Sequence, residues 1–394
     1  MKSSMTTRAR RITLLVVALL GLFAIGTFSL PYARAASLIA RAANLGGRIE
    51  AFAHQQSRAV TVQPTSAIPT RYGNVASRLY LPEGRVTRTV LAVPGFHAAG
   101  IDETRLTGLA KDLAGTGVAV MTMALPDLTA YQITPRSTDI IEDAADWMAR
   151  QLDLAPDGRI GIIGISFAGG LSVVAASRPS IRDKIAYVLS FGGHADLPRV
   201  MRYLCTGEAP HVDGLETHPP HDYGVAVILY FFADRGVVPP EQVQPLREGV
   251  GTFLLASQLT LVDMKQANDT FAKAREMVKA LPEPSATYLR YVNERNVKAL
   301  GPVLLPYGTD VGGDPALSPQ RAPAPPAAPV YLLHGADDTV IPAAESVMLA
   351  HYLEGKAHVR LLLSRLITHA EVDKSAAASE TWKLVLFWGD VLRQ

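Results

Sequence analysis

Apolar and polar residues alternate along most of this chain in blocks that predict strands followed by helices. Runs such as Val118–Met123 and Ile160–Ile163 are almost wholly apolar, which is typical of central strands covered on both faces. Helical segments of ten or more residues separate them, which predicts right-handed crossovers and an α/β fold with a doubly wound, mostly parallel sheet. The predicted strands are Ala59–Gln63, Ser77–Leu81, Thr89–Val93, Val118–Met123, Ile160–Ile163, Ile185–Phe191, Val330–Leu333 and Val359–Leu363, and the predicted helices are Glu103–Ala114, Thr138–Leu152, Phe167–Ser177, Ala343–Tyr352 and about Ser375 to Leu392.

Residues 194–329 interrupt this rhythm and predict an inserted helical cap that ends in a Pro/Ala-rich linker, Ala316–Pro329. Within it, Val225–Ala233 is too short to span a bilayer. This apolar run is either a buried cap helix or the wall of an acyl-binding pocket. The predicted cap helices are Asp222–Arg235, Gln244–Met264 and Gln266–Leu281.

Residues 1–36 have the pattern of a signal-anchor or a signal peptide. The uncharged run Ile12–Leu30 is near the length that spans a bilayer. Basic residues precede it, and they orient the rest of the chain out of the cytoplasm. Ala33-Arg34-Ala35 is a possible cleavage site, so retention as a membrane anchor and secretion after cleavage at Ala35 both stay open. Arg10-Arg11 hints at twin-arginine export. Residues 37–57 predict a juxtamembrane helix.

The composition narrows the class of protein. A chain of 394 residues with a net charge of +2 and no basic block beyond the N-terminus gives no sign of nucleic-acid binding. Cys205 is the sole cysteine, so intramolecular disulfides and CxxC motifs are excluded. The length suffices for one large α/β domain with an insertion.

The candidate chemistry begins at Ser166 in "GISFAG", where an apolar strand ends and a helix begins. A nucleophilic serine there needs a strained turn with small residues two positions away on either side, and Gly164 and Ala168 are both small. By itself this G-x-S-x-A match is weak, because glycine-rich joins between strands and helices are common.

Two later loops supply the groups that such a serine needs. "HGADDTVIP" follows the strand Val330–Leu333, and "ITHAEV", with His369, follows the strand Val359–Leu363. Parallel strands bring their C-terminal ends to one edge of a sheet, and the order Ser, Asp, His is that of an α/β-hydrolase triad.

From Val60 to Gln394 the sequence resembles the α/β-hydrolase superfamily in these three motifs, with core segments 58–193 and 330–394. The resemblance implies that Asp338 is the triad acid, with Asp337 or Asp196 as alternatives, and that His369 is the base. It also implies an oxyanion hole formed by the N–H groups of Phe96 and Phe167. Pro94-Gly95 stands where the family usually has His-Gly, and His97 is either at the mouth of the site or a loop residue.

The sequence therefore predicts a serine hydrolase that cleaves a small-molecule carboxylic ester through an acyl-enzyme outside the cytoplasm, without a cofactor. Alternatives are a peptidase or acyltransferase of the same fold, or a catalytically silent envelope binding protein. Histidines in the insertion have irregular spacing and predict no metal site. They are His194, His211, His218 and His221.

Overall fold

The apolar runs form the strands of a single sheet in the computed structural model, which describes residues 29–42, 47–260, 263–311, 313–367 and 374–394. In the described part of the chain the order is β1-β3-β5-β4-β6-β7-β8-β9, and β2 pairs with β3. Strands β4 to β9 run parallel, whereas β3 is antiparallel to β1, β2 and β5. The strands are β1 Val60–Val62, β2 Ser66–Thr70, β3 Gly73–Pro82, β4 Thr89–Val93, β5 Ala119–Met123, β6 Ile160–Ile165, β7 Ile185–Phe191, β8 Val330–Gly335 and β9 Val359–Ser364.

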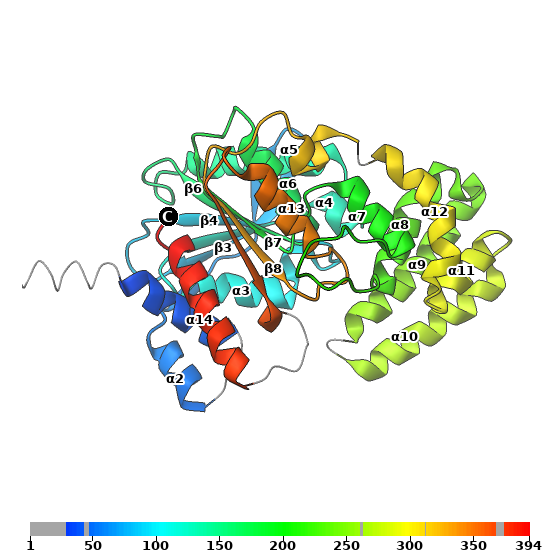
Figure 1. Ribbon diagram of the computed structural model, residues 1–394, viewed down its shortest axis with the longest axis horizontal. Coiled ribbons are helices and arrows are strands. Elements are labelled where there is room, and N and C mark those ends of the chain that lie inside the picture. The colour runs from blue at the N-terminus through cyan, green and yellow to red at the C-terminus, as the bar shows by residue number, and fades with distance from the viewer. Residues whose placement is uncertain (1–28, 43–46, 261–262, 312, 368–373) are drawn as a thin grey trace, which may run out of the picture.

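Helices cover both faces of this sheet (Figure 1). Every residue of β4, β5 and β8 is buried, which explains their unbroken apolar sequences. One apolar core joins the sheet to α5, α6 and the insertion, and a second joins it to α3, α14 and the N-terminal helix. The helices of the two layers are α3 Thr104–Ala114, α4 Pro126–Thr129, α5 Pro135–Ala149, α6 Phe167–Ser177, α13 Ala344–Leu353 and α14 Lys374–Val391. The predicted α/β class with a mostly parallel sheet is confirmed.

The insertion between β7 and β8 is helical and lies to one side of the sheet (Figure 1). Three of its helices follow the predicted segments within a few residues, but three others gave no clear pattern. One of these, α12, contains Pro302 and Pro306, which sequence reasoning takes as helix breakers. The helices are α7 Leu197–Thr206, α8 Asp222–Phe232, α9 Pro240–Leu259, α10 Met264–Met277, α11 Ser285–Asn293 and α12 Val297–Val311.

The N-terminal region packs against the sheet layer. Residues 29–42 are helical, so the predicted boundary at residue 36 falls inside a helix, and α2 (Gly47–Gln55) follows. Ala35 and Leu38 are buried in the second core. Tyr32 donates a hydrogen bond to Asp390 of α14 at 2.7 Å. No helix in the described residues is long and apolar enough to span a membrane, and Ile12–Leu30 lies almost entirely outside them.

Candidate active site

Ser166 sits between β6 and α6 in a backbone conformation that few residues adopt. Its φ of 56° and ψ of −131° lie in a region where an L-residue is strained. Such strain persists only when the surroundings enforce it, and it concentrates at functional sites. The turn leaves Ser166 half-buried at the start of α6, which is the arrangement of a nucleophile elbow.

Close packing around the turn explains its small residues. A Cβ on Gly164 would lie 2.5 Å from Ser172 Oγ and 2.7 Å from the carbonyl carbon of Ala168, so only glycine fits there. Ala168 is fully buried, and its methyl group is accommodated. On the other side, a Cβ on Gly95 would lie 3.0 Å from Ser166 Cβ. The loop after β4 therefore touches the elbow directly.

Hydrogen bonds hold the C-terminal ends of neighbouring strands at one edge of the sheet. The N–H of Ser166 donates to the Phe191 carbonyl at 2.7 Å, and the N–H of Gly192 donates to the Leu333 carbonyl at 2.8 Å. Asp338 Oδ2 lies 3.6 Å from the position that a Cβ on Gly192 would occupy. The structure thus brings Ser166 and Asp338 to the same edge.

His369 lies outside the described residues, in the segment 368–373. The preceding strand ends at Ser364, whose carbonyl accepts a 3.1 Å hydrogen bond from the N–H of Ala336. Because Ala336 begins the Asp338 loop, the chain enters the His369 segment from the edge that carries the acid.

Asp338 shapes its own loop with one carboxylate oxygen. Its Oδ1 accepts hydrogen bonds from the N–H groups of Val340 at 2.8 Å and Ile341 at 3.0 Å. The buried His334 donates from Nε2 to the Ile341 carbonyl and lies 3.6 Å from Asp338 Oδ2. Among the described residues no donor is within hydrogen-bond distance of Oδ2, so this oxygen can orient a histidine.

The two alternative acids have other neighbours. Asp337 Oδ1 lies 3.6 Å from His218 Nε2, on the side of the insertion. Asp196 caps the N-terminus of α7, where its Oδ1 accepts from the N–H of Arg199 at 3.1 Å and its Oδ2 accepts from Arg321 Nε at 2.6 Å. Both oxygens of Asp196 therefore hold the base of the insertion.

Phe96 and Phe167 flank Ser166, and their rings pack with centroids 4.9 Å apart. Phe167 is the first residue of α6, where a backbone N–H has no partner within the helix. Neither the Phe96 nor the Phe167 N–H donates to an acceptor in the part of the chain that the structure describes. Two free donors beside a serine are what an oxyanion hole requires.

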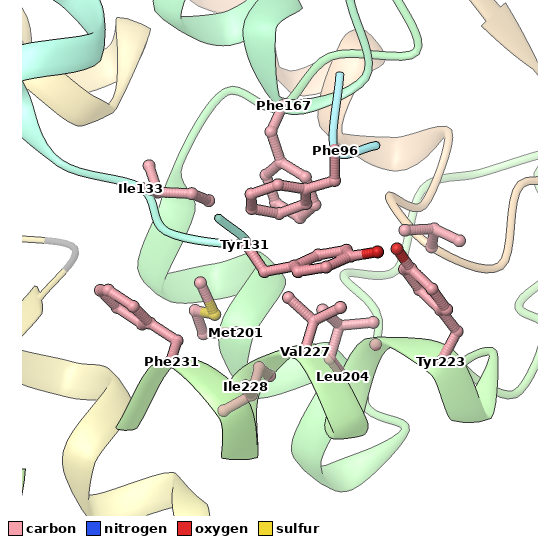
Figure 2. Close-up of a pocket in the computed structure, with 12 residues that line it drawn as sticks. Phe96, Tyr131, Ile133, Phe167, Met201, Leu204, Tyr223, Val227, Ile228 and Phe231 are labelled. Atoms are coloured by element: carbon pink, nitrogen blue, oxygen red, sulfur yellow. The ribbon is translucent and has the colours of Figure 1, made fainter. Parts of the chain in front are cut away.

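An apolar cavity lies against these two phenylalanines and under the insertion (Figure 2). It has about 370 Å³ of empty space, little of which is wide enough for water. The ring of Tyr131 crosses its centre, and the Tyr131 and Tyr223 hydroxyls point toward each other. The lining residues are Phe96, Tyr131, Ile133, Phe167, Met201, Leu204, Tyr223, Gly224, Val227, Ile228, Phe231 and Val340.

Helix α8 is a buried helix, and Val227, Ile228 and Phe231 line this cavity. That the cavity binds an acyl group stays a prediction. Tyr131 was missed by sequence reasoning: it has a positive φ of 55°, and Gln258 of α9 donates a 2.7 Å hydrogen bond to its hydroxyl. Burial raises the pKa of Tyr131, which keeps the phenol neutral. The sequence around Tyr131 gives no sign that its ring lines a cavity, because the α9 residue that binds its hydroxyl is remote along the chain.

The histidines around the insertion have separate structural roles. His194 is fully buried behind Phe167, and its Nε2 donates to the Leu317 carbonyl at 2.7 Å. Burial lowers the His194 pKa. His221 caps the N-terminus of α8, and its Nδ1 accepts the N–H of Tyr223 at 3.1 Å. Within the described residues no three His, Cys, Asp or Glu side chains form a group that could hold a metal ion.

His97 stabilises the loop after β4. Its Nδ1 accepts the N–H of Ala99 at 3.2 Å, and its carbonyl accepts the N–H of Gly100 at 2.9 Å. Burial lowers the His97 pKa and favours the neutral ring that can accept this bond. These contacts agree with the interpretation of His97 as a loop residue, and His97 does not line the cavity.

Solved structures similar to this chain include hydrolases at low sequence identity. An esterase from Pyrobaculum calidifontis is 14% identical with a TM-score of 0.44, and the match covers 87% of this chain and 89% of the esterase. An acylaminoacyl peptidase from Pyrococcus horikoshii is 12% identical with a TM-score of 0.43. That match covers 88% of this chain but 43% of the peptidase. No curated protein matches significantly.

The family assignment rests on the sequence together with the fold. The family model described as "alpha/beta hydrolase fold" matches residues 89–364, more than half of the chain. The match includes β4 to β9, the elbow at Ser166 and the Asp338 loop. The chain belongs to the α/β-hydrolase fold family.

Proposed function

We propose that this α/β-hydrolase cleaves carboxylic esters with Ser166 as nucleophile, His369 as general base and Asp338 as the acid that orients the histidine. The observation that carries the proposal is the strained turn at Ser166, which is packed against Gly95. The next residue, Phe167, has a backbone N–H with no acceptor among the described residues. A strained serine has no structural purpose at a strand–helix join, since glycine would adopt this φ at lower cost.

The proposed reaction uses these three residues. Ser166 Oγ attacks the ester carbonyl while His369 takes the hydroxyl proton, and the N–H groups of Phe96 and Phe167 stabilise the negative oxygen of the tetrahedral intermediate. Collapse of the intermediate breaks the bond to the leaving alkoxide, which receives the proton from His369. Water, deprotonated by the same histidine, then attacks the acyl-enzyme and releases a carboxylic acid and free Ser166.

Asp338 is preferred as the acid because no donor of the described residues occupies its Oδ2, while its Oδ1 fixes the loop geometry. Asp196 has both oxygens engaged. Asp337 faces His218 from the same loop and is the remaining alternative. Accordingly, Asp338→Asn should reduce hydrolysis far more than Asp337→Asn.

The apolar cavity supports an ester whose acyl group is aliphatic or aromatic. Phe96 and Phe167 border both the cavity and the nucleophile, so an acyl chain entering the cavity would keep its carbonyl near Ser166. The narrow space must widen to admit such a group, and displacement of the Tyr131 ring from its centre is the simplest way.

The decisive test is active-site labelling of the full chain with a fluorophosphonate, followed by peptide mapping. The folded protein should label at Ser166, and Ser166→Ala should not label. A folded wild-type chain that fails to label at Ser166 would refute the nucleophile assignment. Hydrolysis of p-nitrophenyl esters of increasing chain length would then define the acyl preference.

The same proposal places the catalytic domain outside the cytoplasm, tethered by the N-terminal segment. The basic residues before Ile12–Leu30 support this orientation. Ala35 is completely buried, and Tyr32 is hydrogen-bonded to α14, so cleavage after Ala35 would remove contacts that the domain uses. We therefore favour the retained segment, and the intact mass of the protein from its native envelope distinguishes the two outcomes.

A further inference from the structure

A second, larger cavity lies at the N-terminal end of the fold, apart from the active site. It is formed by helical residues 29–42, α2 and the turn after α3, and contains about 1170 Å³ of space, part of it open to solvent. In Figure 1 these helices are on the opposite side of the sheet from the helices of the insertion. The lining residues are Leu30, Ala33, Arg34, Ala36, Ser37, Ala40, Phe52, Ala53, Gln56, Arg58, Gly115 and Thr116.

The walls are mainly apolar, and two large apolar side chains lie at the surface beside them. Leu30 is 47% exposed and Phe52 is 63% exposed, although both line the cavity. About 550 Å³ of this space is wide enough for water, which lies within the range of pockets that hold ligands of drug size, roughly 300–1,000 Å³. Its size and its apolar surface fit a flexible hydrocarbon chain.

Two guanidinium groups give the cavity a positive charge that no carboxylate of the described residues neutralises. Among the described residues Arg34 and Arg58 have no carboxylate partner, and Arg58 donates only to the Glu83 carbonyl, at 3.3 Å. Burial lowers the pKa of Arg34, and repulsion from Arg58 lowers it further. In contrast, the nearby Arg41 is buried and paired with Asp112 at 2.7 Å. An anion between Arg34 and Arg58 would relieve their repulsion.

We propose that this cavity binds a single-chain anionic amphiphile, with the hydrocarbon chain along the apolar wall and the head group at Arg34 and Arg58. A long-chain fatty acid and a lysophospholipid share this chemistry, and the head group is a carboxylate in the first and a phosphate in the second. The site is separate from the proposed catalytic centre and would serve to hold the domain at a lipid surface.

The test uses the full chain in phosphatidylcholine nanodiscs and three diazirine probes of equal chain length: a fatty acid, a lysophosphatidic acid and a fatty alcohol. After irradiation, crosslinked peptides are mapped by mass spectrometry. We expect the anionic probes to label residues within 33–58 or 111–118 about tenfold more than the alcohol does. The alcohol lacks a charged head group, and the loss of one charge-assisted hydrogen bond to an arginine lowers affinity by about this factor. The anion that labels more strongly identifies the head group.

Variants separate this site from general contact with lipid. Arg34→Gln and Arg58→Gln should each reduce labelling by the anionic probes, and Ala36→Trp should reduce it by filling the space. Arg290→Gln, an exposed arginine in the insertion, is the matched control and should have no effect. Equal labelling by the alcohol, or labelling unchanged in the three cavity variants, would overturn the proposal. Fluorophosphonate labelling of Ser166 should be the same in all these proteins, so a failed catalytic proposal would be recognised separately.

Discussion

The substitution Gly164→Ala tests how the nucleophile is held. The added Cβ would lie 2.5 Å from Ser172 Oγ and 2.7 Å from the Ala168 carbonyl carbon, whereas carbon contacts are optimal at about 3.5–4.0 Å. The Ser172 hydroxyl can rotate away, but Ala168 belongs to the first turn of α6 and its backbone cannot. Relief therefore requires a shift of about 1 Å between β6 and α6. Because Ser166 joins these two elements, it must move as well.

We expect Gly164→Ala to destabilise the fold by about 1–3 kcal/mol, the usual cost of overpacking. A 1 Å misplacement of a reacting group costs about 10²-fold in rate, so fluorophosphonate labelling of Ser166 should slow by that factor. The matched control is Gly108→Ala on α3, where the new Cβ would meet nothing within 4 Å apart from its own stretch of helix backbone. That change should stabilise the helix by roughly 0.5–1 kcal/mol and leave labelling unchanged. If Gly164→Ala melts and labels like the wild type, the close packing of the elbow is refuted.

Three further predictions concern the insertion, the cavity and the charged surface. Glu345 is fully buried and accepts hydrogen bonds from two backbone N–H groups and from Arg199. Glu345→Gln should therefore lower the free energy of unfolding, measured with a chemical denaturant, by about 3–5 kcal/mol. An unchanged denaturation midpoint would contradict the role of Glu345 as a buried partner of Arg199. Val227→Trp should fill the cavity beside Phe167. The rate of p-nitrophenyl octanoate hydrolysis should then fall much more than the rate of p-nitrophenyl acetate hydrolysis. An equal loss for both esters would argue against an acyl pocket. Burial opposes ionisation of Asp139, but hydrogen bonds from Tyr72 and Arg178 outweigh it and lower the Asp139 pKa. The ionised group therefore adds stability above its ordinary value near 3.8, and this stability is lost as the pH falls through the lowered pKa. Asp139→Asn should thus lower the Tm at pH 7 and converge with the wild type in acid, and a difference that persists at the lowest pH would exclude the ion pair as its source.

The order of strands and helices was readable because each central strand is covered on both faces and must be apolar throughout. The predicted strands Ile160–Ile163 and Val330–Leu333 therefore begin at the observed residue, and the observed strands end two residues later, at Ile165 and Gly335. The insertion was harder, because its helices pack on one another and on the domain from several sides and lose a clear polar face. Helix α12 is an example: its two prolines are tolerated inside a helix that packs along α7.

The sequence alone determined the α/β class and identified Ser166, the Asp337-Asp338 pair and His369 as candidates, because the chemistry requires these residue types at strand ends. Only the tertiary structure decided that Oδ1 of Asp338 is engaged by its own loop, that both oxygens of Asp196 are occupied, and that Tyr131 lines the cavity. Only it revealed that the helix of residues 29–42, which overlaps the end of the predicted N-terminal segment, packs into the core of the domain through Ala35 and Leu38. Hydrophobic patterning records whether a residue is buried, whereas the partner of each buried group depends on segments brought together from distant parts of the chain.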